Sequence, residues 1–274
     1  MKSKKRKLQQ PLSNGDKLAR LLKSQSLNLE SLLEEISKFK NRFFDNAELE
    51  FELFLSNGFP LEIIDDKVVL KTNITPIHEQ TFCVVDIETN GSNVQKGQII
   101  ELGAVKFKNG EIVDKFDSLV YAKDIPKYIQ EVTNITPDML QDAPTIEKVL
   151  QEFKLFLEDD VFVAHDIKFD YKFISESFNK YDLGKLENRK LCTIDLAKRT
   201  IKAERYGLDF LKTLLKIDID NHHRAYSDAL STAYILKHSM SALPSDVKLA
   251  EELITFSKSD NIINRTKDKK VKHV

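Results

Sequence analysis

Acidic side chains lie next to apolar segments at several places in the sequence. Asp86 and Glu88 come at the end of the apolar segment 81–86, and side chains two residues apart share one face of a strand. Two carboxylates side by side at the edge of a core repel each other unless a cation compensates them. Oxygen ligands suit Mg²⁺ or Mn²⁺. The alternative for this pair alone is an ordinary surface or turn position.

Two further aspartates and a histidine follow later in the chain. Asp170 comes where a helix is expected to begin, and an aspartate there is also a common helix cap. Asp228 lies near the first turn of an expected helix, 225–240, whose apolar stripe predicts contact with a sheet. His223 precedes Asp228 by five residues, a spacing that one helical face does not bring together. We therefore expect His223 in the loop that leads into the helix.

The elements around these residues predict an α/β fold. The strand-like segments are 81–86, 98–108, 111–120, 161–164 and 190–194, and the helical patterns are 145–157, 171–180, 208–215 and 225–240. Asn109-Gly110 joins two of the strands and is a strong hairpin signal. Strands that first form a meander and then alternate with helices indicate a mixed β-sheet flanked by helices.

Composition excludes several classes of protein. The 274 residues are 41% hydrophobic and 31% charged, with a net charge of -1, which excludes global disorder and binding of nucleic acid by bulk charge. Cys83 and Cys192 do not form a disulfide framework or a zinc-ligand spacing. We see no secretory signal and no apolar stretch long enough for a membrane helix. A cytoplasmic protein without a membrane partner is expected.

The chain divides into four expected parts. Residues 1–25 are predicted to be a basic flexible tail, and residues 26–75 a small α+β unit that resembles a reduced winged helix. The four acidic residues and His223 fall within a larger domain at 78–243, followed by a C-terminal helix and basic tail at 244–274. The small unit is rich in acidic residues, which repel phosphate. A protein contact, or contact with the rest of the chain, is therefore expected for it.

The carboxylates and the histidine, taken in order, form a motif set. D-x-E, D and H-x-x-x-x-D, spread over 81–240, resemble the DEDDh family of 3′-5′ exonucleases, as does the phrase Ile135-Thr136-Pro137-Asp138-Met139-Leu140. Within that family the chain is most similar to the proofreading epsilon subunits of bacterial DNA polymerase III. The resemblance implies a ribonuclease H-like exonuclease fold. Two departures are Asp166, where the family often has Asn, and Thr133-Asn134, where it often has His-Gly.

The resemblance also implies a role for each residue. Two divalent ions, Mg²⁺ or Mn²⁺, would be held by four carboxylates: Asp86, Glu88, Asp170 and Asp228. Asp86 would bridge the ions, and His223 would take the proton from the attacking water. Thr89 and His165 would contact the terminal nucleotide of the substrate.

The implied function is removal of nucleotides from single-stranded or frayed DNA 3′ ends, with the DNA polymerase III catalytic subunit as partner. One alternative is an exonuclease that trims RNA 3′ ends. An alternative of another class is a non-catalytic module that binds nucleic acid or a polymerase. The unit at 26–75 and the helix after Pro244 are the candidates for docking on the polymerase, and contact with the nuclease domain is the alternative for both.

Overall fold

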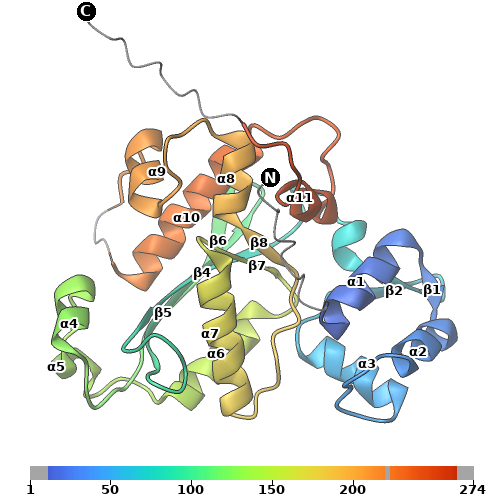
Figure 1. The fold of residues 1–274 in the computed structure, drawn as a ribbon, viewed down its shortest axis with the longest axis horizontal. Coiled ribbons are helices and arrows are strands. Elements are labelled where there is room, and N and C mark those ends of the chain that lie inside the picture. The colour runs from blue at the N-terminus through green and yellow to red at the C-terminus, as the bar shows by residue number, and fades with distance from the viewer. Residues whose placement is uncertain (1–11, 220–222, 264–274) are drawn as a thin grey trace, which may run out of the picture.

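The computed structural model describes residues 12–219 and 223–263. Its larger unit contains a five-stranded sheet with the order β6-β5-β4-β7-β8 (Figure 1). The strands are β4 (Phe82–Thr89), β5 (Ile99–Lys108), β6 (Glu111–Leu119), β7 (Val161–Ala164) and β8 (Lys190–Cys192). β4, β5 and β6 form an antiparallel meander, whereas β7 and β8 run parallel to β4. The predicted mixed sheet is confirmed.

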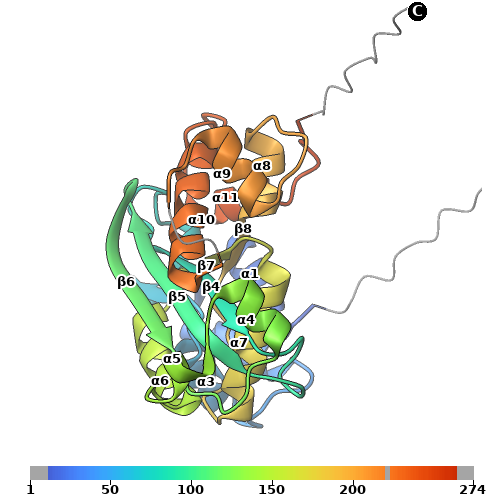
Figure 2. The ribbon, with the colours of Figure 1, turned by 90° about the vertical axis from the view of Figure 1, so that its left-hand side faces the viewer.

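Helices cover both faces of this sheet (Figures 1 and 2). The helices of this larger unit are α4 (Lys127–Thr133), α5 (Pro137–Leu140), α6 (Ile146–Leu157), α7 (Ile167–Lys180), α8 (Thr193–Thr200), α9 (Leu208–Leu215), α10 (Ala225–Met240) and α11 (Ala250–Phe256). Buried side chains of α6 and α7 pack on one face, and those of α8, α10 and α11 on the other. None of the helices within the described residues is long and apolar enough to cross a membrane.

The central strand β4 sends alternate side chains to the two faces. Cys83 and Val85 join the core under α6 and α7, and Phe82 and Val84 join the core under α10. Because side chains alternate along a strand, Asp86 continues the series that faces α10. The apolar alternation of β4 therefore determines which helix the acidic end of the strand meets.

The smaller unit precedes the sheet. It comprises α1 (Asn14–Ser24), β1 (Leu27–Asn28), α2 (Leu29–Ser37), α3 (Ala47–Ser56), β2 (Leu61–Ile64), β3 (Lys67–Leu70) and the 3₁₀ turn η1 (Lys71–Asn73). Its small sheet has the order β1-β3-β2. The small unit therefore combines helices and a small sheet, and its likeness to a winged helix stays a prediction.

The prediction of a flexible tail over residues 1–25 is wrong for residues 14–24, which form α1. The hydroxyl of Ser13 caps this helix by accepting a hydrogen bond from the N–H of Asp16 at 3.0 Å. Leu18 and Leu22, one helical turn apart, are buried in the core of the small unit. The basic clusters near both termini, at 1–11 and 264–274, lie outside the described residues.

The segment between the two units is bonded to the C-terminal part of the chain. The N–H of Ile77 donates to the carbonyl of Lys248 at 2.9 Å, and the N–H of Ala250 donates to the carbonyl of Thr75 at 3.0 Å. The hydroxyl of Thr72 donates to Glu251 at 2.8 Å in a buried contact. These hydrogen bonds hold the C-terminal helix α11 against the segment that connects the two units.

Candidate active site

The structure brings three of the predicted carboxylates together. One oxygen each from Asp86, Glu88 and Asp228 lies within 4.8 Å of the others. The first two come from the end of β4, and Asp228 comes from the first turn of α10. Since α10 packs on the face of β4 that carries Asp86, residues more than a hundred positions apart converge there.

Asp170 lies beside this cluster, in the first turn of α7. Its side chain is buried, and its charge raises the pKa values of both Asp86 and Glu88. Burial raises the pKa of Asp170 itself to about 7, although the backbone N–H of Ile87 opposes that rise. The charges of all four predicted carboxylates therefore interact with one another.

Each carboxyl group of the cluster is less acidic than usual. Burial, and then the neighbouring acids Glu101, Asp228 and Asp170, raise the pKa of Glu88 to about 8. Burial, and then the charges of neighbouring acids, raise the pKa of Asp86 well above its usual range. Burial also raises the pKa of Asp228. Charged oxygens held so close together need protons or a cation to compensate them.

The donor set fits a divalent metal ion. The ligand atoms are all carboxylate oxygens, which Mg²⁺ and Mn²⁺ prefer. Oδ1 of Asp228 is buried and has no hydrogen-bond partner. A buried oxygen without a donor is costly unless another group satisfies it, and a cation between the three carboxylates would do so.

His223 lies next to the acids. It is exposed and has a positive φ of 60°, and it directly precedes Arg224, the N-cap residue of α10. Burial raises the pKa of Asp228, and the backbone N–H of His223 together with its ring opposes that rise. The structure therefore places His223 in the lead-in loop, close to Asp228.

Thr89 and His165, the two residues predicted to contact the substrate, have side chains that form hydrogen bonds within the protein. The hydroxyl of Thr89 donates to the carbonyl of Gly91 at 3.0 Å. In His165, Nδ1 lies 2.8 Å from the hydroxyl oxygen of Thr193 and Nε2 lies 2.9 Å from the carbonyl of Tyr206. Burial lowers the pKa of His165 to about 4, so the ring is neutral near pH 7.

Asp166, which replaces the Asn common in this motif, is exposed and has a φ of 74° at the N-cap of α7. Asn and Asp tolerate this left-handed conformation better than other residues with a Cβ atom. The Asp166 carboxylate raises the pKa of Asp170. Asp166 can therefore adopt the same backbone conformation as an asparagine, whereas its carboxylate adds a negative charge to an acidic site.

Lys212 was not identified from the sequence. It lies on α9 with 3% of its surface exposed, and its Nζ is 4.0 Å from Oδ1 of Asp228. Its charge lowers the pKa of Asp228. One feature of the sequence could have revealed it. Lys212 lies on the apolar face of an amphipathic helix, at a position that normally takes an apolar residue.

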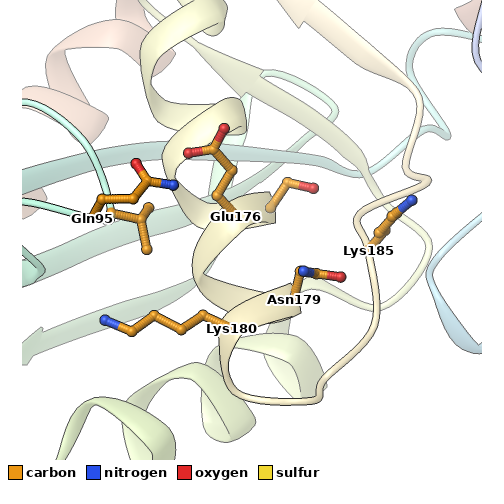
Figure 3. Close-up of a pocket in the computed structure, with 7 residues that line it drawn as sticks. Gln95, Glu176, Asn179, Lys180 and Lys185 are labelled. Carbon is orange, nitrogen blue, oxygen red and sulfur yellow. The ribbon is translucent and has the colours of Figure 1, made fainter.

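A surface hollow of about 650 Å³ lies elsewhere on the nuclease unit (Figure 3). It is lined by Val94, Gln95, Ser175, Glu176, Asn179, Lys180 and Lys185. Most of these residues belong to the second half of α7 or follow it, whereas Asp170 lies in its first turn. The hollow is therefore distinct from the carboxylate cluster.

The Exonuclease family model matches residues 83–236, a segment that contains all four carboxylates and His223. The chain belongs to the DEDDh exonuclease family. Among curated relatives of this exonuclease, the PolC-type DNA polymerase III of Staphylococcus haemolyticus is 42% identical over 178 residues, which are 63% of this chain and 12% of that protein. The PolC-type DNA polymerase III of Staphylococcus aureus is 40% identical over 186 residues, which are 67% of this chain and 12% of that protein.

Solved structures show the same fold for this DEDDh exonuclease. Exonuclease X in complex with 5′-overhanging duplex DNA is 26% identical with a TM-score of 0.52, and the match covers 64% of this chain and 99% of that one. Escherichia coli exonuclease I in complex with a dT13 oligonucleotide is 16% identical with a TM-score of 0.53, over 60% of this chain and 42% of that one. The predicted ribonuclease H-like fold is confirmed.

Proposed function

We propose that this exonuclease hydrolyses the terminal phosphodiester bond at DNA 3′ ends, using two divalent ions, Mg²⁺ or Mn²⁺. The observation that carries the proposal is the convergence of oxygens from Asp86, Glu88 and Asp228 within 4.8 Å of one another. The relationship to PolC-type DNA polymerase III supports DNA as the substrate, and so does the likeness to exonuclease X in complex with DNA.

Each residue then has a defined task. Asp86, Glu88 and Asp228 would hold one ion, and Asp170 would help to hold the other. Bound divalent ions stabilise negative charge on the attacking and leaving oxygens and make water more acidic. His223 takes the proton of the attacking water. Thr89, at the end of β4, and His165, next to α7, help to position the terminal nucleotide.

The DNA polymerase III catalytic subunit is the proposed protein partner, in the cytoplasm. Support comes from the PolC-type relatives, whose names are those of polymerases although this chain spans only 12% of their length. Sedimentation of the full chain with that subunit at micromolar concentration tests the proposal. A complex is expected, whereas independent sedimentation of the two proteins would rule out a stable partnership.

Digestion of end-labelled oligonucleotides tests the activity itself. Matched single-stranded DNA and RNA, each labelled at either end, are incubated with Mg²⁺ or with a chelator. We expect mononucleotide release from the 3′ end of DNA, dependent on Mg²⁺ and lost in Asp86→Asn. Faster digestion of RNA would favour the RNA-trimming alternative. No digestion of either polymer, together with Mg²⁺-independent binding, would favour a non-catalytic binding module.

A further inference from the structure

Glu101 is a buried carboxylate beside the metal site. It is 1% exposed and lies on β5, directly across from Glu88 on β4 in the antiparallel register. Its charge raises the pKa values of both Glu88 and Asp86. A fifth carboxylate at this place adds to the electrostatic repulsion among the four acids of the site. A charged carboxylate persists in a core only when hydrogen bonds and an opposite charge compensate it.

Both oxygens of Glu101 are occupied by the start of α10. Oε1 accepts hydrogen bonds from Nε of Arg224 at 2.8 Å and from Nη2 at 2.5 Å. Oε2 accepts a hydrogen bond from the backbone N–H of Ala225 at 2.9 Å. The N–H groups of a helix's first turn lack partners within the helix and favour negative charge nearby. Glu101 thus caps α10 from a neighbouring strand, and Arg224 neutralises it.

Gly103 brings α10 onto the same face of β5. It is two residues from Glu101, so both positions face the helix. A Cβ atom added at Gly103 would lie 2.1 Å from the backbone N of Tyr226 and 2.3 Å from the carbonyl carbon of Ala225. The backbone of the helix therefore touches the strand directly, and the Glu101 contacts fix its first turn there.

We propose that Glu101 is a positioning residue for the proposed nuclease reaction, acting through Arg224 and Ala225. The first turn that it fixes contains Asp228, whose N–H donates to the carbonyl of Arg224 at 3.0 Å. His223 is the residue directly before Arg224. By holding Arg224 and Ala225 against β5, Glu101 sets where Asp228 and His223 lie relative to the acids on β4. A metal-ligand role for Glu101 is the rival, and the occupation of both its oxygens argues against it.

Four variants separate positioning from ligation: Glu101→Ala, Glu101→Gln, Arg224→Ala and the double variant Glu101→Ala/Arg224→Ala. In Glu101→Ala we expect kcat on single-stranded DNA to fall roughly ten- to a hundredfold, because small displacements of reacting groups are costly. KM is expected to change by less than about threefold, since nothing here places Glu101 on the substrate. Glu101→Gln keeps one acceptor oxygen and is expected to lose less. The double variant is expected to match the worse single variant, because the two residues act as one unit.

Two readouts do not require nuclease activity, so a failure of the proposed function can be distinguished from a failure of this inference. Amide hydrogen exchange at residues 225–228 is expected to be at least about tenfold faster in Glu101→Ala without metal, and unchanged elsewhere in the sheet. Mg²⁺ binding, measured by calorimetry, is expected to weaken by about tenfold because Asp228 is displaced. Glu176→Ala, which removes a half-buried acid 3.7 Å from Lys172 on α7, is the control.

Two results would overturn the inference. One is a Glu101→Ala protein whose first turn of α10 exchanges at the wild-type rate. The other is complete loss of Mg²⁺ binding in Glu101→Gln, equal to that in Asp86→Asn, since this would make Glu101 a ligand.

Discussion

Nζ of Lys212 lies 4.0 Å from Oδ1 of Asp228, so a buried ammonium group lies within a site that is rich in carboxylates. In the metal-free protein Lys212 compensates part of the charge that a bound cation would compensate. The lysine and the cation therefore compete electrostatically for the same carboxylate.

Replacement of Lys212 by Met keeps the aliphatic stem and removes the charge. Because a positive charge this near the site opposes a cation, Mg²⁺ affinity is expected to rise roughly threefold to tenfold, as measured by calorimetry. Lys198→Met is the matched control, since it removes a half-exposed lysine 3.6 Å from Asp195 on α8. Weaker Mg²⁺ binding in Lys212→Met would mean that Lys212 supports the ion rather than opposing it.

Mg²⁺ binding is expected to depend on pH. The pKa values of Glu88 and Asp170 are raised to about 8 and about 7, so in the metal-free protein near neutral pH Glu88 is mostly protonated and Asp170 is partly protonated. A metal must displace these protons, so its affinity rises as pH rises through that interval and falls as pH drops. Calorimetry in buffers of different ionisation enthalpy measures the released protons. Affinity and proton release that stay constant from pH 6 to pH 9 would contradict the raised pKa values.

Gly103→Ala is expected to abolish most of the activity without unfolding the sheet. The added Cβ atom would lie 2.1 Å from the backbone of Tyr226, so α10 must move away from β5 and carry Asp228 with it. The matched control is Gly207→Ala at the N-cap of α9, where an added Cβ meets nothing within 4 Å. Nuclease rate and Mg²⁺ affinity are compared for the two variants. Equal values in both would show that the close approach at Gly103 is not required.

His165 is expected to make the free energy of unfolding decrease as pH falls. Its pKa is lowered to about 4 in the folded protein by burial, so the unfolded chain takes up a proton first as pH falls below about 6.5. The stability it contributes is present above about pH 6.5 and lost toward pH 4, by up to about tenfold in the folding equilibrium per pH unit. Urea unfolding of His165→Gln should lack this decline. If both proteins lose stability equally over this interval, His165 is not held neutral.

Much of the fold follows from local sequence signals. The helix at Ala225–Met240 and the hairpin turn at Asn109-Gly110 agree with their patterns, and both turn residues have the positive φ that Asn-Gly favours. Helix α1 was missed because the basic residues before it suggested a tail, although Ser13 and the apolar spacing of Leu18 and Leu22 were readable signals.

Only part of the candidate site could be predicted from the sequence. The motif order identified the acids, because each lies at the end of a strand or the start of a helix. Lys212 and Glu101 were not identified, because their roles depend on α9 and β5 meeting α10, which is a tertiary contact without a local pattern. Side chains that compensate charge across elements cannot be found from spacing alone.

Asp86, Glu88, Asp170 and Asp228 are proposed to bind divalent cations. Anomalous diffraction from crystals grown with Mn²⁺ would locate such cations. We expect a strong Mn²⁺ peak within about 2.3 Å of oxygens from Asp86, Glu88 and Asp228, and a second peak toward Asp170. Fully ordered carboxylates with no Mn²⁺ peak among them would contradict the proposal.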